Sequence, residues 1–141
     1  MKEALLSIIK DENRIITGQI DPQYLSDNLG RKKGTAEAVV FPVSTEEISG
    51  VMRYAWKNNL PVTPRGAGTN LVGSTVPSGH GIVLDVSLMN HILELDEETF
   101  TATVEPGVVL EDFQAYVESK GLFYPPDPGE KKATIGGNIS T

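Results

Sequence analysis

One stretch near the middle of the chain combines three glycines with an arginine directly behind a short apolar run. Residues 62–73 read VTPRGAGTNLVG. Glycine leaves backbone amides uncovered, and consecutive amides can form a nest that binds an anion. The guanidinium of Arg65 would add a fixed cation with paired donors. The same residues also suit a structural turn in which Arg65 pairs with a surface carboxylate, and local physics leaves both readings open.

Two common phosphate-binding signatures do not fit this stretch. Gly66 and Gly68 have the spacing of the first two glycines in G-x-G-x-x-G, but Leu71 stands at the third position. The following STVPSGHG cannot form the helix that this dinucleotide fingerprint requires. No Lys-Ser or Lys-Thr pair ends the loop, which excludes the phosphate loop of nucleotide triphosphatases. We therefore expect a glycine-rich turn that leaves the end of a strand.

The other residues with reactive side chains give weaker signals. The chain has two histidines and no cysteine, which excludes disulfides, thiolate metal sites and a cysteine nucleophile. His80 lies between glycines and is predicted to be a loop residue. His91 shares a predicted strand face with Leu93 and Leu95, so we expect it to pack rather than to act as a base. The absence of cysteine agrees with a reducing cytoplasm.

The charge balance narrows the classes of partner. A net charge of -7 over 141 residues argues against nucleic acid and anionic lipid surfaces as partners. The run Arg31-Lys32-Lys33 is predicted to be a solvated turn, with a phosphate role as the alternative. No apolar run is long enough to span a membrane, and the sequence predicts a soluble, cytoplasmic protein.

Apolar periodicity predicts the elements that would position the glycine-rich turn. It indicates helices at 2–11, 45–58 and 109–120, strands at 38–41, 60–64 and 82–87, and a hairpin of 91–95 with 100–105. Residues 21–35 and those after 121 are expected to be loops. The order strand, helix, strand over 38–64 predicts a parallel pair with the helix crossing over. With the hairpin, this gives an α+β fold rather than a doubly wound sheet.

Four ordered segments resemble successive motifs of one family: PVTPRGAGTNLVG, GIVLDVSLMNHILELD, TATVEPGV and GLFYPPDPGEKKATIGGNIST. They are similar to the FAD-binding (PCMH-type) domain of the FAD-linked oxidases of the vanillyl-alcohol oxidase type, above all the FAD-linked glycolate oxidase subunit and D-lactate dehydrogenases. The resemblance runs from about Ala38 to Thr141. It implies a small parallel βαβ subdomain plus an antiparallel sheet, incomplete at its carboxyl-terminal end. Residues 1–36 would be a helix and lead-in loop, and 37–141 the amino-terminal part of the FAD-binding domain.

The resemblance also implies which residues contact the cofactor. The glycine-rich loop would wrap the FAD pyrophosphate, and two later segments would line the flavin and its ribityl chain. The implied contacts are Pro64, Arg65, Gly66, Ala67, Gly68, Thr69, Asn70, Gly73, Ser74, Pro126, Asp127, Pro128, Thr134, Ile135, Gly136, Gly137, Asn138, Ser140 and Thr141. Some members attach flavin through a histidine where this chain has Thr69, so FAD is expected to be non-covalent. No catalytic residue and no metal ligand is expected here.

The function implied is the FAD-binding portion of a flavin-dependent 2-hydroxy-acid oxidoreductase. Its substrate would be a small 2-hydroxy acid, and its partners other oxidase subunits, through which it would be peripheral to a membrane. The substrate domain of the family has no counterpart in these residues, so the chain alone is expected to be inactive. Two alternatives stay open: a FAD-dependent sugar-nucleotide reductase of the same fold, which PPDPG disfavours, and a non-catalytic remnant that binds a partner.

Overall fold

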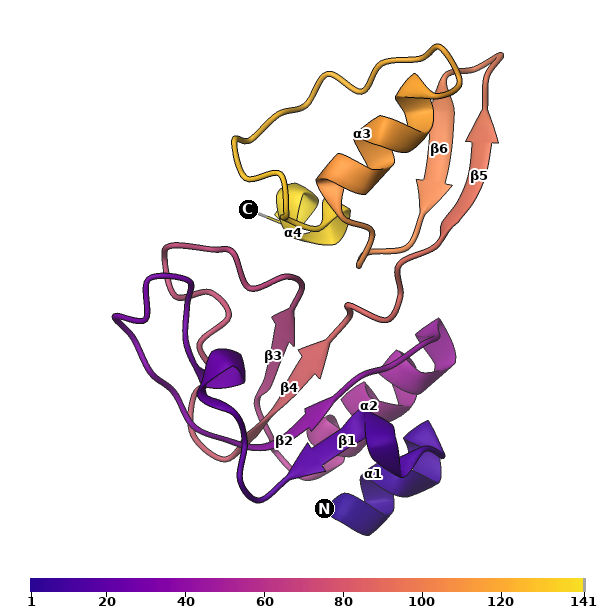
Figure 1. The fold of residues 1–141 in the computed structure, drawn as a ribbon. Helices are drawn as coiled ribbons and strands as arrows, with labels where there is room; N and C mark the ends of the chain where they lie inside the picture. The colour runs from indigo at the N-terminus through magenta and orange to yellow at the C-terminus, as the bar shows by residue number, and fades with distance from the viewer. Residues whose placement is uncertain (141) are drawn as a thin grey trace.

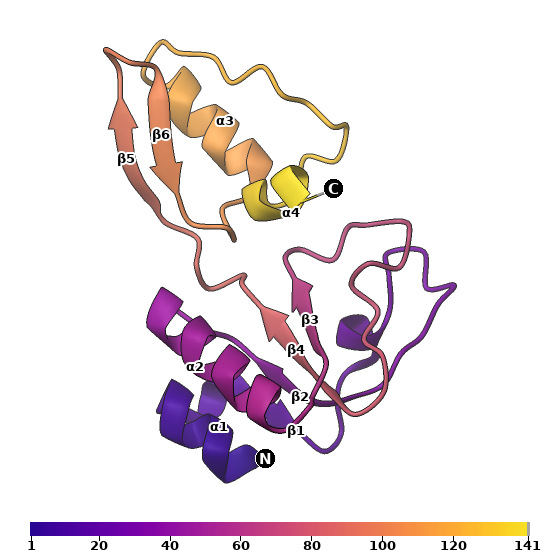
Figure 2. The same ribbon diagram turned by 180° about the vertical axis from the view of Figure 1, so that it is seen from behind.

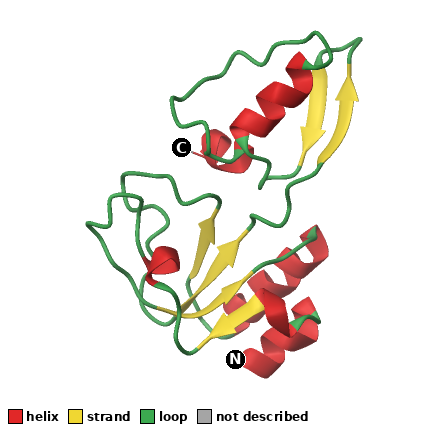
Figure 3. Ribbon diagram, in the orientation of Figure 1, coloured by secondary structure: helices red, strands yellow, loops and turns green. Residues whose placement is uncertain are grey.

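The computed structural model describes residues 1–140, which form two bodies joined by the segment after strand β4 (Figure 1). The first body holds a four-stranded sheet, and the second holds a two-stranded sheet (Figure 3). No helix of the described residues is both long and apolar enough to cross a membrane.

Two helices cover one face of the four-stranded sheet (Figure 2). Helix α1 spans Lys2–Ile9 and helix α2 spans Thr45–Lys57, as the periodicity predicts. The Ser44 side chain caps α2 by accepting a hydrogen bond from the amide of Glu47 at 3.2 Å. Apolar side chains of both helices bury against the sheet, namely Leu5, Ile9, Val51 and Ala55 against Ala38, Val40, Ile82 and Leu84.

The amino-terminal segment is more than a helix and a lead-in loop. Strand β1 (Ile15–Thr17) pairs antiparallel with β2 (Ala36–Val40), and a short 3-10 helix (Pro22–Leu25) follows within the predicted loop. Side chains of this segment cover the second face of the sheet, where Tyr24 meets Phe41 edge to face. A strand of three residues is too short to show a period of two, which is why the sequence did not indicate it.

The sheet has the order β1-β2-β4-β3, with β3 at Val62–Arg65 and β4 at Gly81–Asp85. The predicted βαβ unit is confirmed in that β2 and β3 run parallel, with α2 between them in the chain, but they are not direct neighbours: β4 lies between them and pairs in parallel with both. All residues of β4 are buried, as expected of the central strand in a parallel sheet covered on both faces. The glycine-rich loop leaves the carboxyl end of β3, at the edge of the sheet.

The second body confirms the predicted hairpin and third helix. Strands β5 (Ile92–Asp96) and β6 (Thr101–Val104) pair antiparallel, and helix α3 spans Leu110–Glu118. Helix α4 (Ile135–Ser140) was not predicted, because its sequence IGGNIS carries two poor helix formers and no apolar period. Contacts with other segments hold α4 in place: the Ile135 amide donates to Val108 O, and the Ile135 side chain is buried against α3.

Candidate cofactor-binding site

The glycine loop, residues 66–75, is closed at its far end by one asparagine. Asn70 Oδ1 accepts hydrogen bonds from the amides of Gly73 at 2.9 Å and Ser74 at 3.0 Å. Its Nδ2 donates to the buried hydroxyl of Thr75 at 2.6 Å. Asn70 therefore fixes the second half of the loop from within.

The first half of the loop keeps its amides unused. Within residues 1–140, the hydrogen bonds donated by the loop's backbone begin only at Gly73, so the amides from Gly66 to Val72 have no protein acceptor. Gly68 and Gly73 adopt φ values of 72° and 81°, in the left-handed region. A run of amides without acceptors, turned by a left-handed glycine, suits an anion with several oxygens. The residues present thus fit a diphosphate.

The Arg65 side chain is held against this loop by contacts with the protein. Its Nη1 donates to Ser26 O at 3.2 Å, and its Cζ lies 5.9 Å from the centre of the Tyr24 ring. A Cβ at Gly68 would collide with the guanidinium, so the two groups are in close contact. Burial lowers the pKa of Arg65, and the neighbouring carboxylate of Asp85 opposes that shift. The guanidinium thus supports the loop, and its predicted contact with phosphate stays a prediction.

The second body reaches the glycine loop through Thr134. A Cβ at Gly66 would collide with Thr134 Oγ1, so the loop and the start of α4 touch where the glycine has no side chain. Thr134 is buried, and its Oγ1 accepts a hydrogen bond from the amide of Gly137 at 3.2 Å. The structure therefore brings these two predicted segments together. The other predicted positions along the loop are half-buried or exposed: Pro64, Ala67, Thr69 and Ser74.

The start of α4 differs from the glycine loop because its amides are used within the protein. The Gly136 amide donates to Pro106 O at 2.9 Å and the Asn138 amide to Thr134 O at 2.9 Å. A Cβ at Gly136 would lie 2.8 Å from Pro106 O, so the close backbone approach expected of this glycine is made to Pro106. Ser140 Oγ donates back to Gly136 O at 2.7 Å. Thr141 lies outside the described residues.

The predicted segment Pro126–Pro128 is exposed along α3. Pro126 O accepts a hydrogen bond from Gln114 Nε2 at 3.4 Å, and Asp127 pairs with Lys131 Nζ at 2.7 Å. Among the described residues, these contacts hold the segment in the second body rather than to the glycine loop. Its role toward the flavin stays a prediction.

Of the two predictions about histidines, one is confirmed and one is wrong. His80 is a loop residue as expected, with a side chain 89% exposed. The expected packing of His91 is wrong: its side chain is 73% exposed, and its Nδ1 lies 2.7 Å from Glu105 Oε2. Leu93 is also 61% exposed, whereas Leu95 packs against the core of the second body, so an irregularity between Ile92 and Glu94 keeps the three residues from sharing one face.

Sequence reasoning missed the contribution of the lead-in segment to the site. The amide of Asn28 donates to Asn70 O at 3.1 Å, next to the bond from Arg65 to Ser26. Between them, Asp27 is 6% exposed, and its Oδ1 has no hydrogen-bond partner within residues 1–140. A buried oxygen without a donor marks a place that another donor would complete. The sequence carries no local signal for these contacts, because they join residues about forty positions apart.

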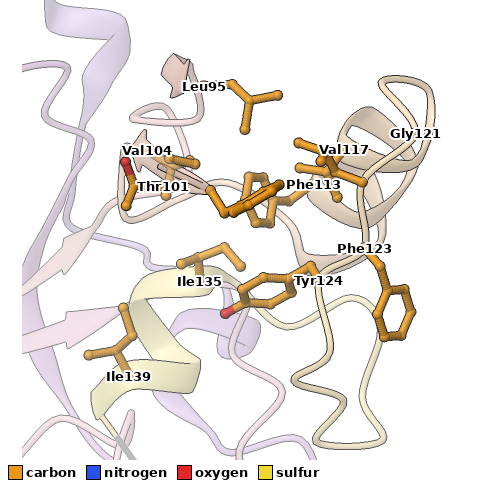
Figure 4. A pocket seen from close by; sticks show the side chains of 13 residues that line it. Leu95, Thr101, Val104, Phe113, Val117, Gly121, Phe123, Tyr124, Ile135 and Ile139 are labelled. Carbon is orange, nitrogen blue, oxygen red and sulfur yellow. The ribbon is translucent and has the colours of Figure 1, made fainter. Parts of the chain in front are cut away.

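A separate cavity of about 550 Å³ lies in the second body, between the hairpin, α3 and α4 (Figure 4). Phe113, Tyr124 and Ile135 converge on it, and none of the described residues that line it is charged. Its size is that of a ligand pocket, but its lining suits an apolar group and not a diphosphate. Of these two places, the glycine loop is the one whose amides suit an anion.

The fold of this chain is similar to that of a solved enzyme structure, p-cresol methylhydroxylase. The structure of p-cresol methylhydroxylase with substrate bound superposes with a TM-score of 0.80 over 98% of this chain and 28% of that one, at 20% identity. At that identity the likeness shows the fold, and it confirms the predicted α+β architecture.

The chain belongs to the family described as FAD binding domain, which matches residues 36–141. It is 45% identical to the glycolate oxidase subunit GlcD of Bacillus subtilis over 99% of this chain and 30% of that protein. It is 42% identical to a D-lactate dehydrogenase of Anaerostipes hadrus over 91% of this chain and 27% of that protein. The chain thus spans less than a third of these relatives. The predicted family and its cofactor, FAD, are confirmed.

Proposed function

We propose that this chain is the part of a flavin-dependent 2-hydroxy-acid oxidoreductase that binds FAD, without a covalent bond, by its pyrophosphate. The observation that carries the proposal is the run of amides from Gly66 to Val72, which lack acceptors within the described residues and lie inside the family's matched region. Arg65 adds a positive charge behind them. The segments Pro126–Pro128 and Thr134–Thr141 would border the flavin.

The substrate class rests on the relatives. A glycolate oxidase subunit and a D-lactate dehydrogenase are both named for 2-hydroxy acids, as are related D-2-hydroxyglutarate dehydrogenases. Bound flavin would supply a hydride acceptor, while the chain's own part is to bind and orient it. The word subunit in one relative's name supports assembly with other oxidase subunits. A cytoplasmic location, peripheral to a membrane through such partners, belongs to the same proposal.

The test is a titration that separates the pyrophosphate from the flavin ring. The protein is titrated with FAD and with riboflavin, which lacks phosphate, and flavin fluorescence reports binding. We expect FAD to bind at one per chain and riboflavin to bind much more weakly. Equal affinity for both ligands, or no binding of FAD, would refute the proposal; failure to bind FAD would favour a remnant that only binds a partner.

A pair of arginine variants refines this test. Arg65→Ala should weaken FAD binding about tenfold or more, because a hydrogen bond to a charged group is worth about 1.5–3 kcal/mol. Arg53→Ala removes an equal charge from the exposed face of α2 and should leave the affinity within about twofold. If both variants bind FAD alike, Arg65 has no local role in the site.

The chain alone should hold FAD without reducing it. Hydride transfer needs a base within hydrogen-bond reach of the substrate hydroxyl, and the two histidines are exposed and paired with Glu37 and Glu105. The measurement is anaerobic: glycolate, D-lactate or D-2-hydroxyglutarate is added to the FAD-loaded chain, and bleaching of the flavin absorption is followed. Reduction well above the rate with free FAD would show that these residues include their own catalytic groups.

A further inference from the structure

The segment from Ser26 to Lys33, here called the basic loop, is fastened to the glycine loop. Its ends are joined by an isolated antiparallel bridge between Ser26 and Lys33. Its backbone meets the glycine loop where the Asn28 amide donates to Asn70 O, and it meets the preceding residue where Ser26 O accepts from the Arg65 side chain. The basic loop therefore keeps a fixed place beside the amides described above.

One side chain of the basic loop reaches across the glycine loop. A Cβ at Gly73 would lie 2.9 Å from Lys32 Cδ and 3.6 Å from Lys32 Nζ. Gly73 has a φ of 81°, a conformation that favours glycine, and the missing side chain leaves room for the lysine stem. Lys32 thus places its ammonium beside Gly73, the residue that follows the run of amides without acceptors.

The charge of Lys32 is not neutralised by the protein. Within residues 1–140 no carboxylate lies within ion-pair distance of it, whereas Lys2, Arg14 and Lys131 are each paired. The basic loop and Arg65 bring four cations to this corner against two carboxylates, Asp27 and Asp85, so the corner is net positive in a chain whose net charge is -7. Such a concentration of positive charge opposes the overall balance and attracts an anion locally.

We propose that Lys32 binds the diphosphate of FAD directly, as a cation supplied from outside the region that the FAD binding domain family matches, which begins at residue 36. The proposal rests on the function proposed above, since it takes the amides of Gly66–Val72 to hold the same group. Lysine suits the role because its ammonium is a compact charge on a flexible stem and can follow a ligand into the loop. Arg65, held by Ser26 and Tyr24, supplies the fixed charge on the other side.

The test compares two neighbouring lysines of the basic loop. Lys32→Gln removes the charge over Gly73, and Lys33→Gln removes an equal charge one residue further, from an exposed side chain whose backbone stays in the bridge to Ser26. Each variant and the unmutated chain are titrated with FAD, riboflavin and ADP at about 20 mM and about 300 mM salt. We expect Lys32→Gln to lose about three- to tenfold in affinity for FAD and ADP at low salt, and less at high salt, where charges are screened. Riboflavin should bind both variants alike, and Lys32→Arg should restore the affinity for FAD.

The outcomes separate this inference from the function on which it rests. If the unmutated chain binds FAD and Lys32→Gln binds it equally well, the role of Lys32 is refuted and the proposed function stands. Equal losses in Lys32→Gln and Lys33→Gln would also refute it, because they would show only the general field of the basic loop. A loss that is the same for riboflavin would place Lys32 at the flavin end instead. If the unmutated chain binds no FAD, both proposals fall.

Discussion

Replacing Gly68 by alanine tests the contact between the glycine loop and Arg65. Gly68 has a φ of 72°, and a residue with a Cβ in this left-handed region costs about 1–2 kcal/mol. The new Cβ would also collide with the Arg65 guanidinium, which would then lose its hydrogen bond to Ser26 O. A bond from a charged donor is worth about 1.5–3 kcal/mol, so Gly68→Ala should lower the free energy of unfolding by about 2.5–5 kcal/mol.

Gly79 offers a matched control for the backbone part of this effect. It has a φ of 68°, and a Cβ there would have no atom of residues 1–140 within 4 Å beyond its chain neighbours. Gly79→Ala should therefore cost only about 1–2 kcal/mol. Urea unfolding followed by circular dichroism gives the free energy of unfolding for each variant. The difference between them isolates the displacement of Arg65.

A double-mutant cycle decides whether Arg65 is the cause. In an Arg65→Ala background the guanidinium is gone, so Gly68→Ala should cost no more than Gly79→Ala does. Two results would refute the reasoning: equal costs for the two glycine variants in the unmutated chain, or an excess cost at Gly68 that persists without Arg65. Either would mean that the guanidinium does not support the loop.

Three further outcomes are expected. Gly136→Ala should destabilise the protein by about 1–3 kcal/mol in urea unfolding, since its Cβ would lie 2.8 Å from Pro106 O. Gly137→Ala should cost less, because among the described residues its Cβ would meet only Thr134 Oγ1, at 3.2 Å. Hydrogen bonding to Arg14 holds the pKa of Glu47 below its ordinary value. The pair therefore stabilises the fold fully at pH values above the ordinary pKa of Glu, and this stabilisation is lost as the pH falls through the lowered pKa. Glu47→Gln should make the loss of stability between about pH 5 and pH 3 less steep. Acid precipitation should release all bound FAD, and a mass spectrum of the denatured protein that carries the mass of FAD would contradict this.

Elements with a clear local period could be predicted from the sequence. Helices α1, α2 and α3 each show apolar residues at helical spacing, and the hairpin shows alternation around an acidic turn. Periodicity is a local property, so it succeeds where one element faces one core. It fails for α4, which holds its shape through contacts to Pro106 and Val108 rather than through its own residues. It also cannot place β4 between β2 and β3, because strand order depends on contacts between distant segments.

For the candidate site too, some features could be predicted from the sequence and others could not. The glycine loop could be singled out from the sequence, because clustered glycines at the end of a strand indicate uncovered amides; the family resemblance, and not the residues alone, favoured a phosphate over a structural turn. The direction of the Arg65 side chain could not, because it depends on Ser26 and Tyr24, about forty residues earlier. For the same reason the basic run was predicted to be a solvated turn. It is exposed as expected, but its position beside Gly73 follows only from the folded chain.

The glycines of the loop are contact points with other segments at this edge of the sheet. Gly66 touches Thr134 of the second body, Gly68 touches Arg65, and Gly73 touches Lys32 of the basic loop. A diphosphate held by the amides between these points would bind all three segments at once, whereas riboflavin would not. Its binding free energy would then stabilise the junction of the two bodies, by an amount that grows with the logarithm of ligand concentration over Kd. Cofactor binding would then be coupled to the relative position of the two bodies, because the contact of Gly66 with Thr134 joins them.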